Sequence, residues 1–456
     1  MGLPAPPVWS TGSSTPRASV VGSLPPMATA PLPPPEALAH APEINPWLVL
    51  LLALGCGLVV ANIYYAQPLA GPISQALGLA PQAAGLIVTV TQLGYGLGLL
   101  FVIPLADYIE NRRLVLCAVA ISGLSMLGAS LAHAVPVFLV CAGLTGISSV
   151  AVQVLVLYAA HMAHDGIRGR VVGSVMVGLM LGIMLARPVS SLIADSASWR
   201  AVYQCAALAM LALVGVLYRA LPARQPHSSI GYATLMASML QMARHSLLLR
   251  RRGLYHACLF ASFSLFWTVI PLHLAQAFAM PQRGIALFAL AGVAGAVAAP
   301  IAGRVADRGW VRPATAVAML CVVLALLLAQ LQLATAPQQI GLLVLVAVVL
   351  DFGVAANLVL GQRVIFSAAA AQRGRFNAIY MATFFAGGAV GSALGGWAYA
   401  QGGWSQAAWT GLAFPLLALA YFQSEWRPAR GAAPLAGGLA AQHQQNAAEQ
   451  GGSGPG

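Results

Sequence analysis

The sequence predicts an all-α membrane protein in which 12 transmembrane helices form two pseudo-symmetric halves of six helices each. Apolar residues make up 59% of its 456 residues and charged residues 7%, whereas roughly a quarter of the residues in soluble proteins are charged. A P-L-A-D sequence ends at Asp107 and a related G-R-V-A-D sequence ends at Asp307, each after the second long apolar stretch of its half. This repeat indicates an internally duplicated helical bundle.

Twelve apolar stretches approach the roughly 20 residues that a helix needs to cross the hydrocarbon core. They begin near Trp47, Ala83, Leu114, Pro136, Val171, Ala201, Gly253, Ile285, Ala314, Gln339, Asn377 and Ser405. The first six predict an N-terminal bundle over residues 46–218, and the last six predict a C-terminal bundle over residues 253–426.

The remaining segments are polar or of low complexity. Residues 1–45 are rich in Pro, Ala and Ser, and residues 427–456 are rich in Gly, Ala and Gln, which predicts disordered tails. Residues 219–252 form a basic linker between the bundles. Its apolar residues Leu235, Met239, Met242 and Leu247 would suit one face of a helix on the inner membrane surface, with the arginines at 250–252 against anionic lipid. We prefer a simple tether because the pattern is weak.

The arginines predict the orientation of the chain. All 22 basic residues are arginines, and most lie in the loops that share one side with the linker. Since cytoplasmic loops carry the positive charge, both termini are expected in the cytoplasm of a multi-pass protein of the bacterial inner membrane. The net charge of +12 is spread over short loops, which argues against nucleic acid as a partner.

Asp351 is a charged residue inside an apolar stretch. It lies about 12 residues, or ~18 Å, into the tenth stretch, near the middle of a ~30 Å hydrocarbon core. A carboxylate is costly to ionise there, which suits a group that takes up and releases a proton. The alternative is a structural carboxyl group that is hydrogen-bonded to Asn357 or to a neighbouring helix.

Arg187 is the second charged residue of this kind and precedes Pro188 in the fifth stretch. Because a guanidinium stays protonated, it must face a carboxylate, a cavity or helix-end carbonyls. It could bind an anionic group of a solute or lock a gate. Alternatively, it could pair with Asp195 or extend toward the membrane surface.

Further polar and aromatic residues within the apolar stretches could line a cavity for a small solute, although Tyr and Trp near the ends of spans also serve as interface anchors. These cavity candidates are Asn62, Tyr64, Tyr65, Gln92, Gln153, Trp267, His273, Asn357 and Tyr380.

Signatures of metal, cofactor or catalytic sites are weak in this chain. His161, His164 and Asp165 have a spacing that could bind a metal, but they lie in a short basic loop without further ligands. No HExxH, P-loop or nucleophile-elbow pattern occurs, so we expect that this protein binds no cofactor and is not an enzyme. Small-residue repeats such as Gly178 with Gly182 and Gly387 with Gly391 predict surfaces on which the two halves rock.

The repeated aspartate sequence resembles the loop signature G-x-L-A-D-R-x-G-R-R of the major facilitator superfamily, and the resemblance covers about residues 47–425. Leu105, Ala106, Asp107 and Arg112 match in the first copy, with Arg113 beside them. In the second copy the matching residues are Gly303, Ala306, Asp307, Arg308 and Arg312. The resemblance implies that these loops help to switch between conformations.

Finer features resemble the drug:proton antiporter branch, in particular its sugar-efflux-permease-like members. They are the A-N-I-Y-Y-A-Q-P sequence around Asn62, the N-L-V-L-G-Q-R sequence after Asn357 and the R-F-N-A-I-Y sequence ending at Tyr380. The arginine that many family members use for proton coupling in the fourth span is absent, so coupling would fall to Asp351.

The resemblance implies a monomeric secondary transporter with alternating access. We expect proton-coupled efflux of a small drug-like or metabolite solute. The main alternative is uptake or exchange of a small organic anion held by Arg187, and the minor one is a non-transporting membrane sensor. Protons, the solute and membrane lipids are the expected partners.

Overall fold

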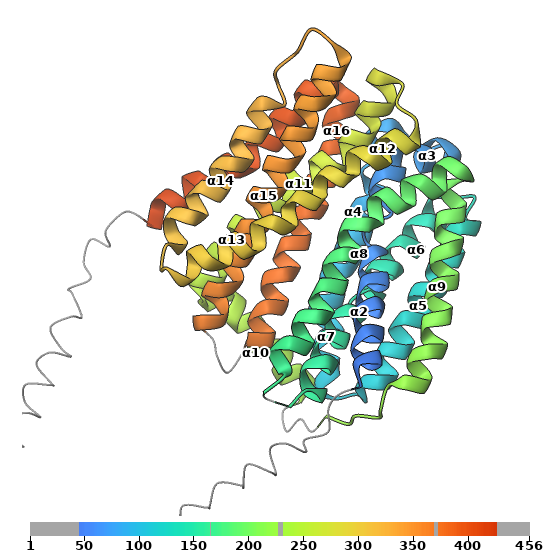
Figure 1. The fold of residues 1–456 in the computed structure, drawn as a ribbon, viewed down its shortest axis with the longest axis vertical. Helices are drawn as coiled ribbons and strands as arrows, with labels where there is room; N and C mark the ends of the chain where they lie inside the picture. The colour runs from blue at the N-terminus through green and yellow to red at the C-terminus, as the bar shows by residue number, and fades with distance from the viewer. Residues whose placement is uncertain (1–44, 165, 227–230, 369–372, 426–456) are drawn as a thin grey trace, which may run out of the picture. The chain divides into compact units, whose positions relative to one another are not determined.

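The secondary structure of the described part of the chain consists of helices joined by short connections (Figure 1). The structure is a computed structural model that describes residues 45–164, 166–226, 231–368 and 373–425. The two predicted tails and Asp165 therefore lie outside the described residues.

The first half runs from α2 to α9. Its elements are α2 (Pro46–Ala61), α3 (Ala66–Leu77), η1 (Pro81–Ala83), α4 (Leu86–Phe101), η2 (Ile103–Asp107), α5 (Asn111–Leu131), α6 (Val135–Ser148), α7 (Ala151–Met162), α8 (Arg168–Ser196) and α9 (Trp199–Ala220).

The second half follows the linker helix α10 (Tyr232–His245). Its elements are α11 (Leu247–Phe278), α12 (Gln282–Ala289), η3 (Leu290–Ala294), α13 (Gly295–Asp307), α14 (Val311–Leu328), α15 (Ala336–Ala368), α16 (Arg373–Phe422) and η5 (Gln423–Glu425).

The described helices account for the predicted membrane spans. Ten are long and apolar enough to cross a membrane, and the bent pair α2 and α3 makes an eleventh. The 50-residue α16 is broken at Gly402 and Gly403, where φ reaches −144° and +64°. At 1.5 Å per residue it is more than twice the thickness of the hydrocarbon core, so its two arms supply the last two of the 12 spans.

The linker contains a helix, and this differs from the simple tether that we preferred. Leu235 and Met239 of α10 are buried, and Met239 packs in a cluster with Ile379 of α16. The hydroxyl of Tyr232 donates to the carbonyl of Phe101 across 2.9 Å. The apolar face of α10 thus packs on protein. Leu247, assigned to this face from the sequence, is exposed and begins α11.

Helix α11 starts six residues before the predicted boundary at Gly253. Ser246 caps its N-terminus, because the Ser246 hydroxyl accepts a hydrogen bond of 3.2 Å from the Leu249 amide. The arginines at positions 250–252 then continue the helix, since arginine is a good helix former.

The pairs Gly178 with Gly182 and Gly387 with Gly391 pack within their own halves, so the prediction that these four residues form the surface between the halves is wrong. A Cβ on Gly182 of α8 would lie 2.2 Å from the Gly57 carbonyl oxygen of α2, and one on Gly391 of α16 would lie 2.0 Å from the Ala261 carbonyl oxygen of α11. Gly85 behaves differently, because its Cβ would lie 2.1 Å from the Ser392 oxygen in the other half.

The two halves contact each other through α3 with α11, α4 with α16 and α8 with α12. Thr89 on α4 lies 2.8 Å from the hydroxyl of Ser392 on α16, and the Arg283 amide donates to Asp195 across 3.2 Å. We call the end of the bundle with Asp195 and Arg283 the arginine-poor end. The end with Asp107 and Asp307 is the arginine-rich end.

Candidate functional site

Asp351 and Arg187, the two charged residues predicted inside apolar stretches, belong to the same site. Asp351 lies on α15 and is 5% exposed, and Arg187 lies on α8 in the other half and is 3% exposed. Among the described residues neither one forms a direct ion pair. Both contact one intervening side chain.

Trp267 of α11 is this intervening side chain. Its indole Nε1 donates a hydrogen bond of 2.8 Å to Oδ1 of Asp351, and its ring lies 4.4 Å from the guanidinium carbon of Arg187. An aromatic ring is positive at its edge and negative on its face. The indole therefore presents its positive edge to the Asp351 carboxylate and its negative face to the Arg187 guanidinium.

Gln67 completes the environment of Arg187 from α3. The Nε of Arg187 donates a hydrogen bond of 2.6 Å to Oε1 of Gln67, which is fully buried. The rings of Tyr64 and Phe263 lie 5.2 and 5.1 Å from the guanidinium carbon. The sequence alternatives for Arg187, a pair with Asp195 or an extension to the membrane surface, are therefore wrong.

Gly292 of η3 leaves space at the same point. A Cβ there would lie 3.0 Å from Oδ2 of Asp351, 3.2 Å from the Trp267 ring and 3.5 Å from Nη1 of Arg187. The three side chains thus face one small region that a larger residue would fill. A cavity of about 10 Å³ adjoins Arg187 and Trp267, which is room for roughly one water molecule.

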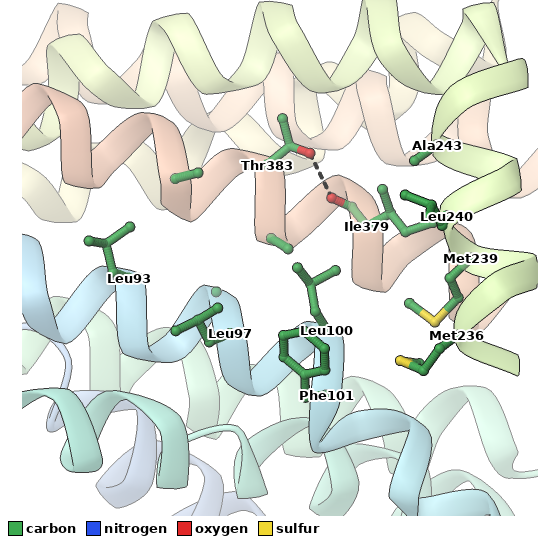
Figure 2. A pocket seen from close by; sticks show the side chains of 13 residues that line it. Leu93, Leu97, Leu100, Phe101, Met236, Met239, Leu240, Ala243, Ile379 and Thr383 are labelled. Atoms are coloured by element: carbon green, nitrogen blue, oxygen red, sulfur yellow. Dashed lines mark hydrogen bonds between the residues drawn. The ribbon is translucent and has the colours of Figure 1, made fainter. Parts of the chain in front are cut away.

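A larger cavity lies between α4, α10 and α16 (Figure 2). It measures about 590 Å³ and is lined almost entirely by apolar side chains. Its one hydroxyl, on Thr383, donates to the carbonyl of Ile379 across 2.8 Å. The cavity therefore offers contact to apolar groups and little hydrogen bonding.

The other candidates of the first half lie apart from the charged pair. Asn62 donates to the hydroxyl of Ser122 across 3.0 Å within this half, and Gln153 donates to the hydroxyl of Tyr95 across 3.2 Å. Tyr65 lines a groove between α2 and α8, whereas the preceding Tyr64 faces Arg187.

Gln92 has a partner in the opposite half. Its side-chain amide donates to the Ser264 hydroxyl across 2.9 Å, and that hydroxyl lies 3.1 Å from the Gln92 carbonyl oxygen.

The candidates of the second half, apart from Trp267, form contacts within that half. His273 stacks on Trp404 with ring centroids 4.7 Å apart. Tyr380 is hydrogen-bonded to His256 across 2.6 Å. Asn357 is buried on α15. The hydrogen bond that Asp351 accepts comes from Trp267 and not from Asn357.

The two copies of the repeated loop make different contacts. In the first copy Arg112 donates to the Tyr218 carbonyl, and Arg113 pairs with Glu110 at 2.7 Å. In the second copy Asp307 pairs with Arg363 of α15. Asp107 and Arg308 are exposed, and a Cβ on Gly303 would meet nothing within 4 Å.

Comparisons with known proteins agree with this architecture. The model of the Major Facilitator Superfamily matches residues 50–332 and again residues 253–443. An uncharacterized transporter of Escherichia coli O157:H7, YgaY, is 36% identical over 378 residues, which are 83% of this chain and 95% of that protein. A probable transporter of Streptomyces coelicolor is 32% identical over 388 residues, 83% of this chain and 87% of that protein.

Solved structures share the fold at low identity. A D-xylose-proton symporter superposes with a TM-score of 0.62 at 18% identity, over 81% of this chain and 96% of that one. A mutant of the nucleoside transporter NupG gives 0.69 at 13% identity, over 83% and 99% of the two chains. The family model and the curated relatives together identify a membrane transporter of the major facilitator type. The chain belongs to the Major Facilitator Superfamily.

Sequence reasoning missed Gln67 and Phe263 as site residues, and it named Tyr64 as a cavity candidate without placing it against Arg187. Gln67 and Tyr64 lie in the A-N-I-Y-Y-A-Q-P sequence that supported the finer resemblance. That sequence therefore contained the signal, although a neutral amide and one of two adjacent tyrosines give no clue to their direction.

Proposed function

We propose that this protein is a proton-coupled secondary transporter that moves a small organic solute by alternating access. The observation that carries the proposal is the contact of Trp267 with both Asp351 and Arg187, since it joins a proton-binding group to a fixed cation at the boundary of the two halves. Trp267 and Asp351 belong to the second half and Arg187 to the first. A rearrangement of the halves would therefore change the contact with Arg187, and the charge on Asp351 can be linked to the conformation.

Asp351 is the group that we expect to carry the proton. Its carboxylate is buried and accepts one hydrogen bond from Trp267, which is modest compensation for a buried charge. A proton on the carboxyl removes this charge and leaves the guanidinium of Arg187 without an anion nearby. The two protonation states should therefore favour different arrangements of α8, α11 and α15.

The direction of transport depends on whether the solute binds with Asp351 ionised or protonated, and the charge of the solute decides which of these states it needs. A solute that binds only when Asp351 is ionised exchanges with the proton, and it is exported by the inward proton gradient, as the sequence predicts. A solute that needs the protonated form moves together with the proton and is taken up. The apolar cavity of about 590 Å³ has the size and lining for a drug-like molecule, which would be the exported solute. The contacts of Arg187 support the second candidate, an organic anion that is taken up together with the proton, and we favour it.

The orientation and the switching loops are part of the same proposal. We propose that the arginine-rich end faces the cytoplasm, because the positive loops gather there. Asp107, Arg112 and Arg113 in the first copy, with Gly303, Asp307 and Arg308 in the second, would then contact one another differently as the cytoplasmic ends of the helices move.

Vesicles that contain the purified protein and a trapped pH-sensitive dye test the proposal. Anionic, cationic and neutral solutes are added in turn to the wild type, to Asp351→Asn and to Asp195→Asn, which removes an exposed acid. A solute that moves protons in the wild type and in Asp195→Asn, but not in Asp351→Asn, supports proton coupling by Asp351. Equal proton movement in all three proteins would reject it.

A further inference from the structure

We propose that Arg187 and Gln67 form a carboxylate-binding site for a small organic acid with an apolar body, and that the acid binds only together with a proton on Asp351. This inference rests on the proposed function and names the class of solute and its stoichiometry.

The donors of the site are fixed relative to each other and buried. Because Nε of Arg187 donates to Oε1 of Gln67 across 2.6 Å, both side chains are held in place. Within the described part of the chain, Nη2 of Arg187 and Nε2 of Gln67 have no hydrogen-bond acceptor. A buried donor without a partner costs roughly 1–3 kcal/mol. Two such donors from α8 and α3 therefore suit a ligand that carries acceptors.

A carboxylate supplies the acceptors that these donors need. It has two oxygens and no donor, and it forms short, charge-assisted bonds with guanidinium groups. When Asp351 is protonated, a neutral ligand would leave the charge of Arg187 uncompensated, and a cation would be repelled by it. The donor set therefore favours an anionic head group.

Aromatic and apolar side chains would surround the body of the ligand. The rings of Tyr64, Phe263 and Trp267 lie within 5.2 Å of the guanidinium carbon, and Ile270 and Phe288 line the adjoining cavity of about 10 Å³. This cavity is too small for an acid. Tyr64 belongs to the first half and Trp267 to the second, so a separation of the halves would widen the site between them.

Charge balance links the acid to the proton. With Asp351 ionised, the buried charges of Asp351 and Arg187 cancel. An added carboxylate would then leave one buried negative charge without a partner, which is strongly unfavourable. With a proton on Asp351, the carboxylate takes the place of Asp351 as the counter-charge of Arg187, and the sum is again zero. One acid should therefore enter with one proton.

Calorimetric titration of the full-length protein in lipid nanodiscs tests the site. The probes are acetate, benzoate and phenylacetate, with neutral phenylacetamide as the control, at three pH values and in two buffers of different ionisation enthalpy. We expect an acid to bind with the uptake of one proton, and its affinity to fall by roughly tenfold per pH unit where Asp351 is ionised. Phenylacetamide should not bind.

Isosteric variants separate the two parts of the inference. Asp351→Asn resembles the protonated carboxyl, so it should bind the acid at every pH without proton uptake. Gln67→Glu replaces a donor by an anion beside Arg187 and should reduce the affinity at least a hundredfold. Gln75→Glu, an exposed change on the same helix α3, should leave it unchanged. Gln67→Leu, which adds no charge, should weaken binding less than Gln67→Glu, provided that both variants keep the elution profile and thermal unfolding temperature of the wild type.

The outcomes distinguish this inference from the proposed function. If none of the three acids binds, or if Gln67→Glu and Gln75→Glu bind equally well, the carboxylate site is wrong. Binding of an acid without proton uptake would contradict the charge balance. Proton-coupled movement of a neutral or cationic solute in the vesicles, without acid binding, would overturn the inference and leave the proposed function standing.

Discussion

The indole N–H of Trp267 donates a hydrogen bond of 2.8 Å to the carboxylate of Asp351, which lies 84 residues further along the chain. The face of the same indole lies 4.4 Å from the guanidinium carbon of Arg187 in the other half. One side chain thus contacts an anion through its positive edge and a cation through its negative face. Trp267 is therefore a shared neighbour of both charged groups, which form no direct ion pair in the described part of the chain.

Replacement of Trp267 by Phe keeps a ring under Arg187 and removes the donor to Asp351. A hydrogen bond to a charged group contributes roughly 1.5–3 kcal/mol, so we expect proton-linked transport to slow by at least about tenfold. The rate of dye response in vesicles measures this. The control is Trp404→Phe, which removes an indole bond of 2.8 Å to the Ala329 carbonyl away from the site. Equal rates for both variants would argue against a role for the Trp267 bond.

Replacement of Gly292 by Ala tests the space between the charges. The added methyl group would lie 3.0 Å from Oδ2 of Asp351 and would have to displace it. We expect a clear loss of solute-linked proton movement with little change in thermal unfolding. Gly341→Ala on α15 adds the same group where nothing lies within 4 Å, so it should transport as the wild type does. Full activity of Gly292→Ala would mean that the region near Gly292 is not used.

Much of the site could be predicted from the cost of burying charge. This cost singled out Asp351 and Arg187, and Trp267 was among the aromatic candidates. Their mutual contact could not be predicted, because spacing along one helix says nothing about its rotation against a helix 80 or more residues away. For the same reason the sequence could not show which of Tyr64 and Tyr65 faces Arg187. Gln67 was overlooked because a buried neutral amide has no compositional signal.

Prediction of the fold from the sequence has the same limit. Apolar stretches predicted the spans, and a repeated loop predicted two halves. The spacing of Gly182 and Gly391 correctly indicated close helix approach, but their partners are Gly57 and Ala261 of the same half. A small-residue pattern identifies a contact surface and does not identify the helix that packs against it.

Gly391→Leu should lower the stability of the second half. Its Cβ would lie 2.0 Å from the Ala261 carbonyl oxygen of α11, so α16 and α11 would have to move apart. Overpacking of this kind costs roughly 1–3 kcal/mol, which should appear as a lower thermal unfolding temperature in detergent. Gly341→Leu, at an open position, is the control. An unchanged unfolding temperature for Gly391→Leu would contradict this packing.

A cross-link at the arginine-poor end should stop transport if the halves separate there. The hydroxyls of Thr89 and Ser392 lie 2.8 Å apart on α4 and α16. In a background without the six native cysteines, Thr89→Cys with Ser392→Cys should form a disulfide on oxidation. Transport should cease and return on reduction, and each single variant should be insensitive to oxidant. Continued transport by the cross-linked protein would exclude opening at this end.

The central claim is that Asp351 binds and releases the coupling proton, and infrared difference spectroscopy tests it without knowledge of the solute. Spectra of the wild type, Asp351→Asn and Asp195→Asn are recorded in lipid as the pH is lowered. We predict a carboxylic C=O band that grows in the wild type and in Asp195→Asn, is missing from Asp351→Asn, and shifts in Trp267→Phe because the hydrogen bond to the carboxyl group is lost. The same band in wild type and Asp351→Asn would show that Asp351 does not titrate, and would contradict the account.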